Sequence, residues 1–230
     1  MFQQLAHIGA GNLILIDPDH AEDTNINRMV TLTHNDAVNK LAKTAVAERY
    51  VEAINPNASV TVRDKPWQME PQLLKDCTAI FGCVDSVVAR DELERFARRY
   101  SIPYIDVGMD VHGEEGRYFM TGQVVTSLPG RPCMRCMGFI TEEMLAAEQK
   151  RYGAAGGRPQ VVWPNGVLAS TAVGNFMALL TPWNTDLQPC LYLEYDGNRS
   201  TVQPSNRLLF LDGFSCTHFV GTEGVGDLVL

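Results

Sequence analysis

At 230 residues the chain is long enough to bury a substantial core, and its length suggests one large domain or two small ones. Hydrophobic residues make up 45% and charged residues 20%, which is ordinary for a globular protein and argues against the disordered and fibrous classes. The formal net charge of -8 argues against general nucleic-acid binding, which normally requires a basic surface. We therefore expect a globular protein that does not bind DNA or RNA.

The N-terminal segment and the cysteines indicate the compartment. The segment MFQQLAHIGAG has neither a basic start nor a long apolar core, so it does not resemble a signal peptide. No apolar run approaches the ~20 residues that span a bilayer. Six cysteines are too few for a disulfide scaffold at this length. These features predict a cytoplasmic protein with reduced thiols and no membrane contact.

The first half of the chain alternates helices with short strands. This alternation implies right-handed crossovers and a largely parallel sheet. We expect Arg95, Arg98 and Arg99 to form the basic, water-facing side of their helix. In chain order the expected elements are a helix at 2–8, a strand at 13–16, a helix at 35–54, a strand at 59–62, a helical turn at 70–75, a strand at 79–83, a helix at 87–100 and a strand at 104–107.

The second half has a different pattern, with antiparallel strands, a turn-rich loop and two more helices. We predict an α/β fold: a Rossmann-like, mostly parallel sheet with helices on both faces and an antiparallel C-terminal extension. We expect a single domain over 1–230, with its nucleotide-binding part at 1–127 and the remaining segments at 128–230. In chain order these are strands at 116–126, a loop at 129–136, helices at 144–151 and 165–180 with a flexible run at 153–157 between them, and strands at 190–202 and 208–211.

Charged side chains follow two of the predicted strands. Asp17 comes directly after the strand at 13–16, and Asp85 lies in GCVDS after the strand at 79–83. Because ligands bind outside the carboxyl ends of the strands in open α/β sheets, we expect both carboxylates at one edge. Arg28 and Lys43 add cations. A site that activates a carboxylate with ATP needs a carboxylate for the ribose, cations for the phosphates and an acidic group for magnesium.

Four features occur in order along the chain: DPDHAEDTNINR at 17–28, Lys43 twelve residues before Asn55-Pro56, GCVDS at 82–86 and PCMRC at 132–136. Together they resemble the ThiF/MoeB/HesA family, the bacterial relatives of ubiquitin-activating enzymes. Members adenylate the C-terminal glycine of a ubiquitin-like or sulfur-carrier protein, usually as homodimers. The resemblance implies the same reaction, the same class of small protein partner and a homodimer for this chain.

The resemblance also assigns roles to individual residues. The expected cofactors are ATP and magnesium, with zinc as a further candidate. Arg28, Lys43 and Asp85 would be the catalytic residues, because the reaction depends on positioning and charge neutralisation. The implied nucleotide site has Asp17 on the ribose, Thr24 and Asn25 lining the phosphates, Arg28 and Lys43 contacting phosphates, and Asp85 coordinating magnesium.

The chain departs from the family at its start, where members carry a strand and a GxGGxGS loop that cradles phosphates. The segment IGAGN at 8–12 follows polar residues and leads into a strand, so its context is wrong for a phosphate loop. Three interpretations stay open: an N-terminally shortened form, a misplaced start, or a degenerate relative.

Two further departures concern the cysteines. Tetrahedral structural zinc needs four ligands, and only Cys133 and Cys136 form a C-x-x-C pair. Cys190, Cys216 and His218 could complete the site if the fold brings them close. Residues 137–165 contain no cysteine, so we expect no thioester step unless Cys133 or Cys136 is recruited for it. Cys77 and Cys83 are interpreted as buried, small apolar side chains.

Alternatives to adenylation differ in class. A catalytically degenerate member would act as a dimerisation or carrier-binding platform, which the missing glycine loop favours. An NAD-dependent oxidoreductase is disfavoured because Asp17 lies six positions after Gly11 instead of the ~20 that the dinucleotide motif requires. Single residues also have ordinary explanations: Lys43 and Arg28 could be surface cations, Arg90 could lie on a helix surface, and Asp85 could cap the helix near Val87.

Overall fold

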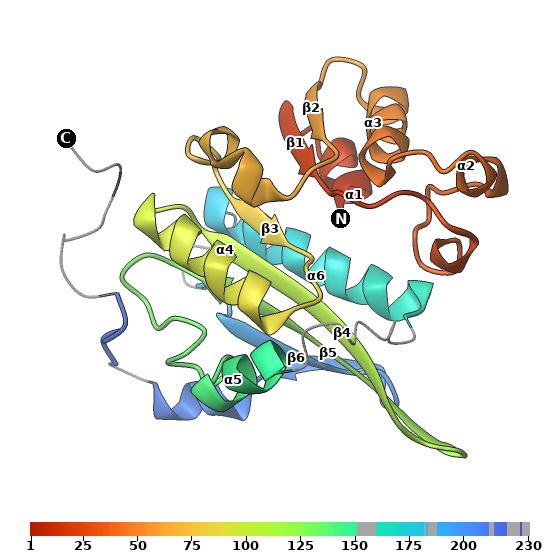
Figure 1. The fold of residues 1–230 in the computed structure, drawn as a ribbon. Coiled ribbons are helices and arrows are strands. Elements are labelled where there is room, and N and C mark those ends of the chain that lie inside the picture. The colour runs from red at the N-terminus through yellow and green to blue at the C-terminus, as the bar shows by residue number, and fades with distance from the viewer. Residues whose placement is uncertain (151–159, 182, 184–187, 212–213, 220–225, 227–230) are drawn as a thin grey trace. The chain divides into compact units, whose positions relative to one another are not determined.

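The computed structural model describes residues 1–150, 160–181, 183, 188–211, 214–219 and 226 (Figure 1). The chain divides into two compact units, Met1–Asp76 with Gln160–Val173 and Cys77–Pro159 with Gly174–Leu230. Each unit has its own β-sheet among the described residues. We describe each unit by itself.

The first unit combines helices with a two-stranded parallel sheet. Strands β1 and β2 pair in register, with Leu13 opposite Val60 and Ile16 opposite Arg63. Val46 and Val51 of α3 are buried, and Phe2 of α1 makes an edge contact with Tyr50 of α3. The elements are α1 (Phe2–His7), β1 (Asn12–Ile16), η1 (Asp23–Asn25), α2 (His34–Val38), α3 (Lys43–Ile54), β2 (Ser59–Arg63), η2 (Trp67–Met69), η3 (Pro71–Leu74) and the first part of α6 (Val162–Leu180).

The IGAGN segment joins helix α1 to strand β1. Gly9 has a φ of +83°, a left-handed conformation that favours glycine at the end of a helix. The Ala10 N–H donates to the Leu5 carbonyl at 3.0 Å, and β1 then begins at Asn12. A helix-to-strand connection is the reverse of the strand-to-helix context of a phosphate loop, as the sequence indicated.

The helix expected at 35–54 is wrong in one respect, because it is two helices, α2 and α3. Lys40 between them has a φ of +47°, and the Leu41 N–H turns back to the Asp36 carbonyl at 3.1 Å. The segment after Lys40 then bonds to the segment after β1, because the Leu41 carbonyl accepts a hydrogen bond from the Ala21 N–H at 2.7 Å. Helical periodicity continues through this break, so the sequence pattern could not locate it.

The Asp36 carboxylate ties the two helices together. It is buried, accepts both Arg49 donors at 2.7 Å, and accepts the Thr33 N–H at 2.9 Å. The hydrogen bonds from the Arg49 guanidinium hold the pKa of Asp36 well below its ordinary range, even though burial opposes this. The charged form is therefore the one that stabilises the fold.

We expect Asp36→Asn to lower the free energy of unfolding by about 2 kcal/mol near pH 7, because a charge-assisted hydrogen-bond pair is lost. A lowered folded-state pKa gives stability that is present above the unfolded pKa of about 3.9 and is lost as the pH falls below it. The difference between wild type and variant should therefore shrink in acid. Urea denaturation across pH 3 to 8 measures this difference in the free energy of unfolding, and Asp64→Asn, at an exposed aspartate, is the control. A difference that stays constant with pH would contradict the prediction.

The second unit is built on a five-stranded sheet in the order β3-β4-β5-β6-β7. The pairing of β3 with β4 is parallel, and the pairings from β4 to β7 are antiparallel. With the parallel β1–β2 pair, this arrangement confirms the α/β fold with an antiparallel C-terminal extension. The elements are β3 (Ile80–Gly82), α4 (Val87–Arg99), β4 (Tyr104–Glu114), β5 (Arg117–Ser127), α5 (Glu142–Lys150), the second part of α6, β6 (Tyr192–Asp196), β7 (Thr201–Pro204) and η4 (Asn206–Phe210).

Helices α4 and α6 cover opposite faces of this sheet. On one face, the Thr126 hydroxyl accepts a hydrogen bond from the side-chain amide of Asn175 of α6 at 3.0 Å. On the other, the Ser127 hydroxyl accepts the Arg98 Nε of α4 at 2.8 Å. Because consecutive residues of a strand point to opposite faces, the two helices lie on either side, as predicted (Figure 1).

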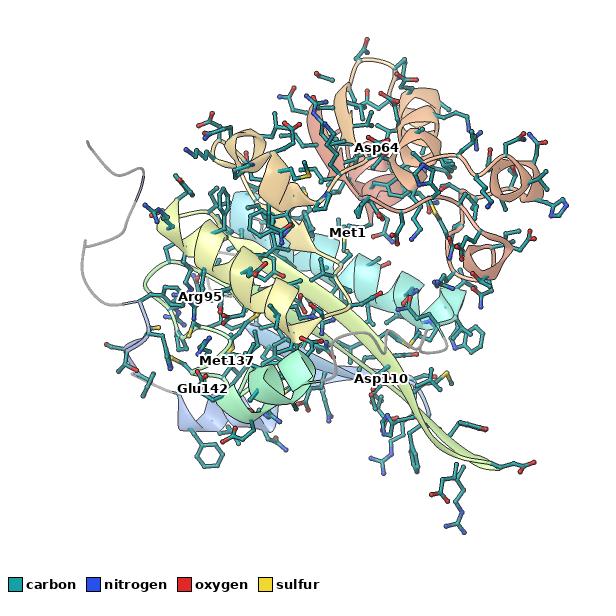
Figure 2. The ribbon with its side chains drawn as sticks, in the orientation of Figure 1. Met1, Asp64, Arg95, Asp110, Met137 and Glu142 are labelled. Atoms are coloured by element: carbon teal, nitrogen blue, oxygen red, sulfur yellow. The ribbon has the colours of Figure 1, made fainter. Side chains whose placement is uncertain are left out.

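Three expectations for this unit are wrong. Arg98 does not face water but is buried between α4 and β5, whereas Arg95 is exposed on the same helix (Figure 2). Cys83 is exposed rather than buried. The strand expected at 208–211 falls on the 3-10 helix η4, whose start is capped by the Ser205 hydroxyl. For Arg98 a set of tertiary contacts overrides the local sequence pattern, and for η4 a helix cap does so.

Helix α6 contributes residues to both units. It begins at Val162, three residues before the predicted start at 165, and ends at Leu180 as expected. Leu168 and Ala172 are buried, whereas Gly166 and Gly174 are exposed. None of the helices in the described part of the chain has the length and apolar character that a membrane span requires.

Candidate functional site

The carboxylate predicted to hold a ribose, Asp17, directly follows β1. Its N–H donates to the Arg63 carbonyl at 3.1 Å, so the parallel pairing with β2 continues through this residue. Its Oδ1 accepts the Asp19 N–H at 2.9 Å, which closes a tight turn. Asp17 is therefore fixed at the carboxyl end of two parallel strands, where open α/β sheets bind ligands.

Lys43 is anchored to the same turn. It is the first residue of α3, and its N–H donates to the Asp19 carbonyl at 3.0 Å. Its Nζ pairs with Asp19 Oδ2 at 2.7 Å, and the lysine side chain is 21% exposed against 65% for the aspartate. The sequence analysis did not identify Asp19 as a partner. The structure thus joins Asp17, Asp19 and Lys43 in one cluster at the strand end.

Thr24, Asn25 and Arg28 form a second hydrogen-bonded group in the loop that follows. The buried Asn25 accepts the Glu22 N–H at 3.2 Å through its side chain, and the Thr24 hydroxyl donates to Glu22 Oε2 at 3.2 Å. The Arg28 guanidinium donates to the Thr24 carbonyl. Asn25 therefore shapes the loop with its side chain, and Arg28 is held half-buried against it.

An apolar cluster fixes this loop on α3. Ala21, Leu32 and Val46 are buried together, and Met29 packs against them. These side chains flank the Thr24 and Arg28 segment on both sides in the sequence. The polar group is thus presented on a rigid base rather than on a free loop, as a binding site requires.

Asp85, the predicted magnesium ligand, lies in the second unit between β3 and α4. The helix is capped by Ser86, whose hydroxyl accepts the Ala89 N–H at 2.9 Å, so the alternative that Asp85 is the cap is wrong. Asp85 is exposed, and within the described residues its carboxylate has no hydrogen bond or ion pair. It is therefore accessible to a cation.

Arg90 is not a plain surface residue. Its Nε pairs with the fully buried Asp106 at 3.2 Å, and Tyr104 donates its hydroxyl to the same carboxylate at 3.0 Å. Burial raises the pKa of Asp106 to about 6, although Arg90 and Tyr104 act in the opposite direction. Asp106 lies within the strand predicted at 104–107, but its pairing with Arg90 depends on the tertiary structure.

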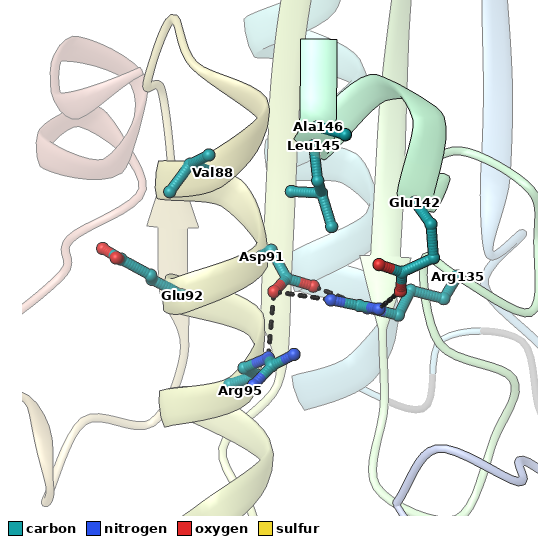
Figure 3. A pocket seen from close by; sticks show the side chains of 8 residues that line it. All are labelled: Val88, Asp91, Glu92, Arg95, Arg135, Glu142, Leu145 and Ala146. Atoms are coloured by element: carbon teal, nitrogen blue, oxygen red, sulfur yellow. Dashed lines mark hydrogen bonds and ion pairs between the residues drawn. The ribbon is translucent and has the colours of Figure 1, made fainter. Parts of the chain in front are cut away.

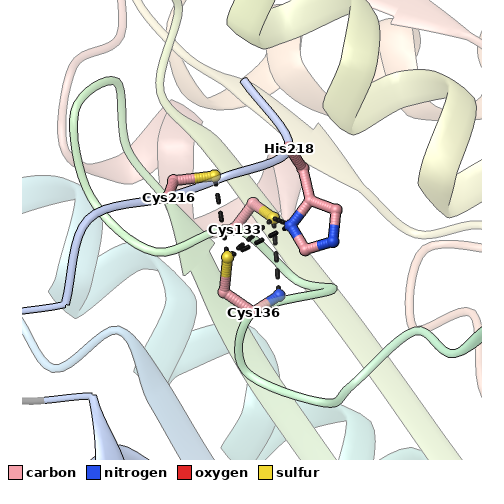
Figure 4. A group of neighbouring side chains, drawn as sticks. All are labelled: Cys133, Cys136, Cys216 and His218. Carbon is pink, nitrogen blue, oxygen red and sulfur yellow. Dashed lines mark hydrogen bonds between the residues drawn. The ribbon is translucent and has the colours of Figure 1, made fainter. Parts of the chain in front are cut away.

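The structure brings Cys133 and Cys136 together with Cys216 and His218 (Figure 4). Cys136 Sγ lies 3.5 Å from Cys133 Sγ, 3.6 Å from Cys216 Sγ and 3.3 Å from His218 Nδ1. All four ligand atoms lie within 4.8 Å of one another. Cys190, the other candidate, instead donates to the Tyr192 carbonyl at 3.4 Å. The C-x-H spacing of Cys216 and His218 was the sequence signal for this half of the cluster.

This donor set fits tetrahedral zinc. Zinc–sulfur bonds of about 2.3 Å and zinc–nitrogen bonds of about 2.0 Å imply ligand separations of roughly 3.5 to 3.8 Å. The close pairs in the cluster match that edge length. Burial raises the pKa of the Cys133 thiol, while backbone N–H groups of His218 and Phe219 lower that of Cys216 against the effect of burial. A bound metal would favour the thiolates further.

A cavity of about 380 Å³ lies between α4 and α5 (Figure 3). Its charged lining is paired: Arg135 donates to both Asp91 oxygens at 2.8 and 2.9 Å and also to Glu142, and Arg95 pairs with Asp91 at 2.9 Å. None of the predicted site residues lines it. We interpret the charged side chains that line the cavity as an ion-pair cluster between the two helices. The lining residues are Val88, Asp91, Glu92, Arg95, Arg135, Glu142, Leu145 and Ala146.

Comparison with known proteins adds the family context. The ThiF family model matches residues 1–209. A segment of 138 residues is 30% identical to the sulfur carrier protein ThiS adenylyltransferase of Bacillus subtilis and covers 59% of this chain and 39% of that protein. A segment of 137 residues is 28% identical to the SAMP-activating enzyme E1 of Haloferax volcanii and covers 59% of this chain and 47% of that protein. The chain thus spans less than half the length of each of these relatives.

The fold is similar to that of E. coli MccB in its crystal structure with ATP. The TM-score is 0.67 at 19% sequence identity, and the match covers 89% of this chain and 59% of that chain. At this identity the similarity concerns the fold alone.

The assignment of the helix cap is testable. We expect Ser86→Ala to lower the free energy of unfolding by about 1 kcal/mol, because the first turn of α4 loses its side-chain acceptor. Asp85→Ala should leave it nearly unchanged, since that carboxylate is exposed and unpaired within the described residues. Urea denaturation at neutral pH compares the two variants. A larger loss for Asp85→Ala than for Ser86→Ala would assign the cap to Asp85.

Proposed function

The chain belongs to the ThiF family, and we therefore propose that it adenylates the C-terminal carboxylate of a small ubiquitin-like or sulfur-carrier protein with ATP. Two relatives, one named as a sulfur carrier protein ThiS adenylyltransferase and the other as a SAMP-activating enzyme E1, support the reaction class. The observation that carries the proposal is the strand-end cluster, in which Asp17 closes a turn and Lys43, paired with Asp19 of that turn, can meet phosphates. We further propose that both units belong to one ThiF-like domain over residues 1–230.

In the proposed reaction a carboxylate oxygen of the carrier attacks the α-phosphate of ATP. The bond from the α-phosphate to the bridging oxygen breaks, and pyrophosphate leaves with its electron pair. The products are the carrier acyl-adenylate and pyrophosphate. The protein need not form a covalent bond, so its contribution is positioning and charge stabilisation.

The roles proposed within the first unit follow from its two polar groups. Asp17 would accept hydrogen bonds from the ribose hydroxyls, and Lys43 and Arg28 would bind phosphates. The Lys43–Asp19 pair supports this role, because exposed ion pairs are weak and a phosphate can replace the Asp19 carboxylate. Thr24 and Asn25 would line the phosphate site, with Asn25 holding the shape of the loop.

Asp85 would hold magnesium in the second unit. Its exposed carboxylate, unpaired within the described residues, suits a hard cation that keeps several waters and binds few protein carboxylates. Magnesium would neutralise phosphate charge. We propose adenylation without a thioester step, because residues 137–165 lack cysteine and the C-x-x-C thiols belong to the metal cluster.

We also propose that the Cys/His cluster holds a structural zinc ion. We propose further that the protein is cytoplasmic and that it forms a homodimer, the latter because the family resemblance implies it. The four clustered ligands support the zinc. A structural zinc with all four positions taken by protein has no open site for substrate. The zinc ion would hold the loop at 129–136 against the segment that carries Cys216 and His218.

A second candidate function is a platform that binds the carrier without catalysis. The IGAGN segment favours it, because it connects a helix to a strand and lacks the context of a phosphate loop. In calorimetry a platform would bind no ATP, and it would still retain a small β-grasp partner in a pull-down. An adenylyltransferase would bind both.

We expect Asp85→Ala to lower carrier-dependent ATP–pyrophosphate exchange by about 100-fold or more, because magnesium and the phosphates lose a charge partner. The fold should stay intact by circular dichroism. Asp64→Ala, which changes an exposed carboxylate after β2, is the matched control and should keep full exchange (Figure 2).

Full exchange by Asp85→Ala would remove Asp85 from the magnesium role. Absence of exchange in the wild-type protein with any cognate carrier, also when a family-type strand and glycine-rich loop are fused before Met1, would contradict adenylation. The platform would then be the better account.

The zinc proposal makes a separate prediction. Purified wild-type protein should contain about one zinc ion per chain, and Cys216→Ser or His218→Ala should lose it, because a tetrahedral site needs all four ligands. Cys190→Ser is the matched control and should retain zinc, since Cys190 bonds elsewhere. Metal analysis of the purified variants measures the content. Zinc loss in Cys190→Ser, or retention in both ligand variants, would contradict the four-residue site.

A further inference from the structure

We propose that Arg98 of α4 is a positioning residue that holds the two halves of the metal centre together. The halves are distant in sequence, with Cys133 and Cys136 after β5 and Cys216 and His218 some 80 positions later. The proposal rests on the zinc site above and does not depend on adenylation. Arg98 is not a ligand, and its effect would act through the segments that carry the ligands.

Arg98 binds the first half through the backbone. Its Nη2 donates to the Arg131 and Pro132 carbonyls, both at 3.0 Å. These carbonyls immediately precede Cys133. One side chain therefore sets the path by which the chain enters the C-x-x-C pair.

Arg98 binds the second half through an aromatic ring. The guanidinium carbon lies 5.1 Å from the centroid of the Phe219 ring, within the range of a cation–π contact. Phe219 immediately follows His218. The Arg98 side chain thus touches the chain next to a ligand of each half.

The surroundings hold Arg98 in place. Its Nε donates to the Ser127 hydroxyl at 2.8 Å, at the end of β5, and pairs with Glu94 Oε1 at 3.7 Å. Glu94 in turn accepts the Met134 N–H at 2.8 Å, between the two cysteines of the pair. Both charged side chains are almost fully buried, at 4% and 1% exposure. Such a buried pair is stable only when hydrogen bonds offset the cost of burying its charges. Three of its backbone partners, the Arg131 and Pro132 carbonyls and the Met134 N–H, belong to the loop at 129–136.

The chemistry of arginine suits this role. Its guanidinium is planar, always charged and carries five donors, so it can bond two carbonyls and a hydroxyl while its face lies on a ring. A lysine ammonium keeps the charge but cannot form this set of contacts at once. Groups that orient metal-bearing segments typically change metal affinity by about 10- to 100-fold when they are replaced.

The test compares zinc affinity in folded protein. Zinc dissociation constants are measured by competition with a chromophoric chelator for wild type, Arg98→Lys and Arg98→Met, and cobalt-substituted spectra report the ligand geometry. We expect about 10- to 100-fold weaker zinc binding in both variants, with altered cobalt spectra. Arg95→Met is the matched control: it removes an exposed arginine of the same helix that pairs with Asp91, and should keep wild-type affinity.

A second variant keeps the test independent of folding defects. Phe219→Leu keeps an apolar side chain but removes the ring, and should weaken zinc binding less than Arg98→Lys does. If Arg98 acts through Phe219, the effects of the two substitutions will not add in the double variant. A purely structural role would lower the stability of the metal-free protein and leave the zinc affinity of its folded fraction unchanged.

Wild-type zinc affinity and cobalt spectra in Arg98→Lys and Phe219→Leu would overturn the proposal, as would additive effects of the two substitutions. Wild-type protein that binds no zinc would overturn it together with the zinc site. Neither result bears on adenylation, which the pyrophosphate exchange assay tests separately.

Discussion

The buried charge pair between Glu94 and Arg98 is the interaction on which the second unit depends. Removing two charges from water costs free energy that close hydrogen bonding must offset. Helix α4 supplies such bonds at the end of β5 and on the backbone of the C-x-x-C loop, although Glu94 Oε2 is buried without a hydrogen-bond partner within the described residues. The same helix is capped at its start by Ser86, directly after Asp85. One element therefore links the candidate magnesium ligand to the candidate zinc centre along the chain.

The candidate site of the first unit uses weaker and more exposed interactions than the buried Glu94–Arg98 pair. Its polar cluster lies at the carboxyl ends of two parallel strands, where Asp17 closes a turn and Lys43 pairs with Asp19. The apolar side chains beneath the following loop supply the rigidity, so the charged groups can exchange partners at little cost. This division suits the proposed ATP binding: the scaffold is held by burial, and the cations proposed to bind phosphates are held by replaceable contacts.

The chain belongs to the ThiF family, and it departs from the family pattern in its glycine segment and in its candidate metal ligands. The glycine segment at 8–12 closes a helix instead of opening one. The second half of the metal cluster is a cysteine and a histidine rather than a second C-x-x-C pair. Adenylation and carrier binding without catalysis differ in what the first departure implies, whereas the proposed zinc centre and its proposed positioning by α4 do not depend on that choice.

The sequence by itself determined the fold class, the carboxyl end of β1 and the ordered set of charged residues, because hydrophobic periodicity and turn residues are local properties. It identified Cys133 and Cys136 and narrowed their partners to three candidates. Only the tertiary structure selected Cys216 and His218 over Cys190, buried Arg98 and split the helix at Lys40. Each of these outcomes depends on a partner tens of residues away or on a backbone turn that periodicity does not encode. Such contacts are decided when the chain packs, since a buried charge or thiol is stable only beside the particular group that satisfies it.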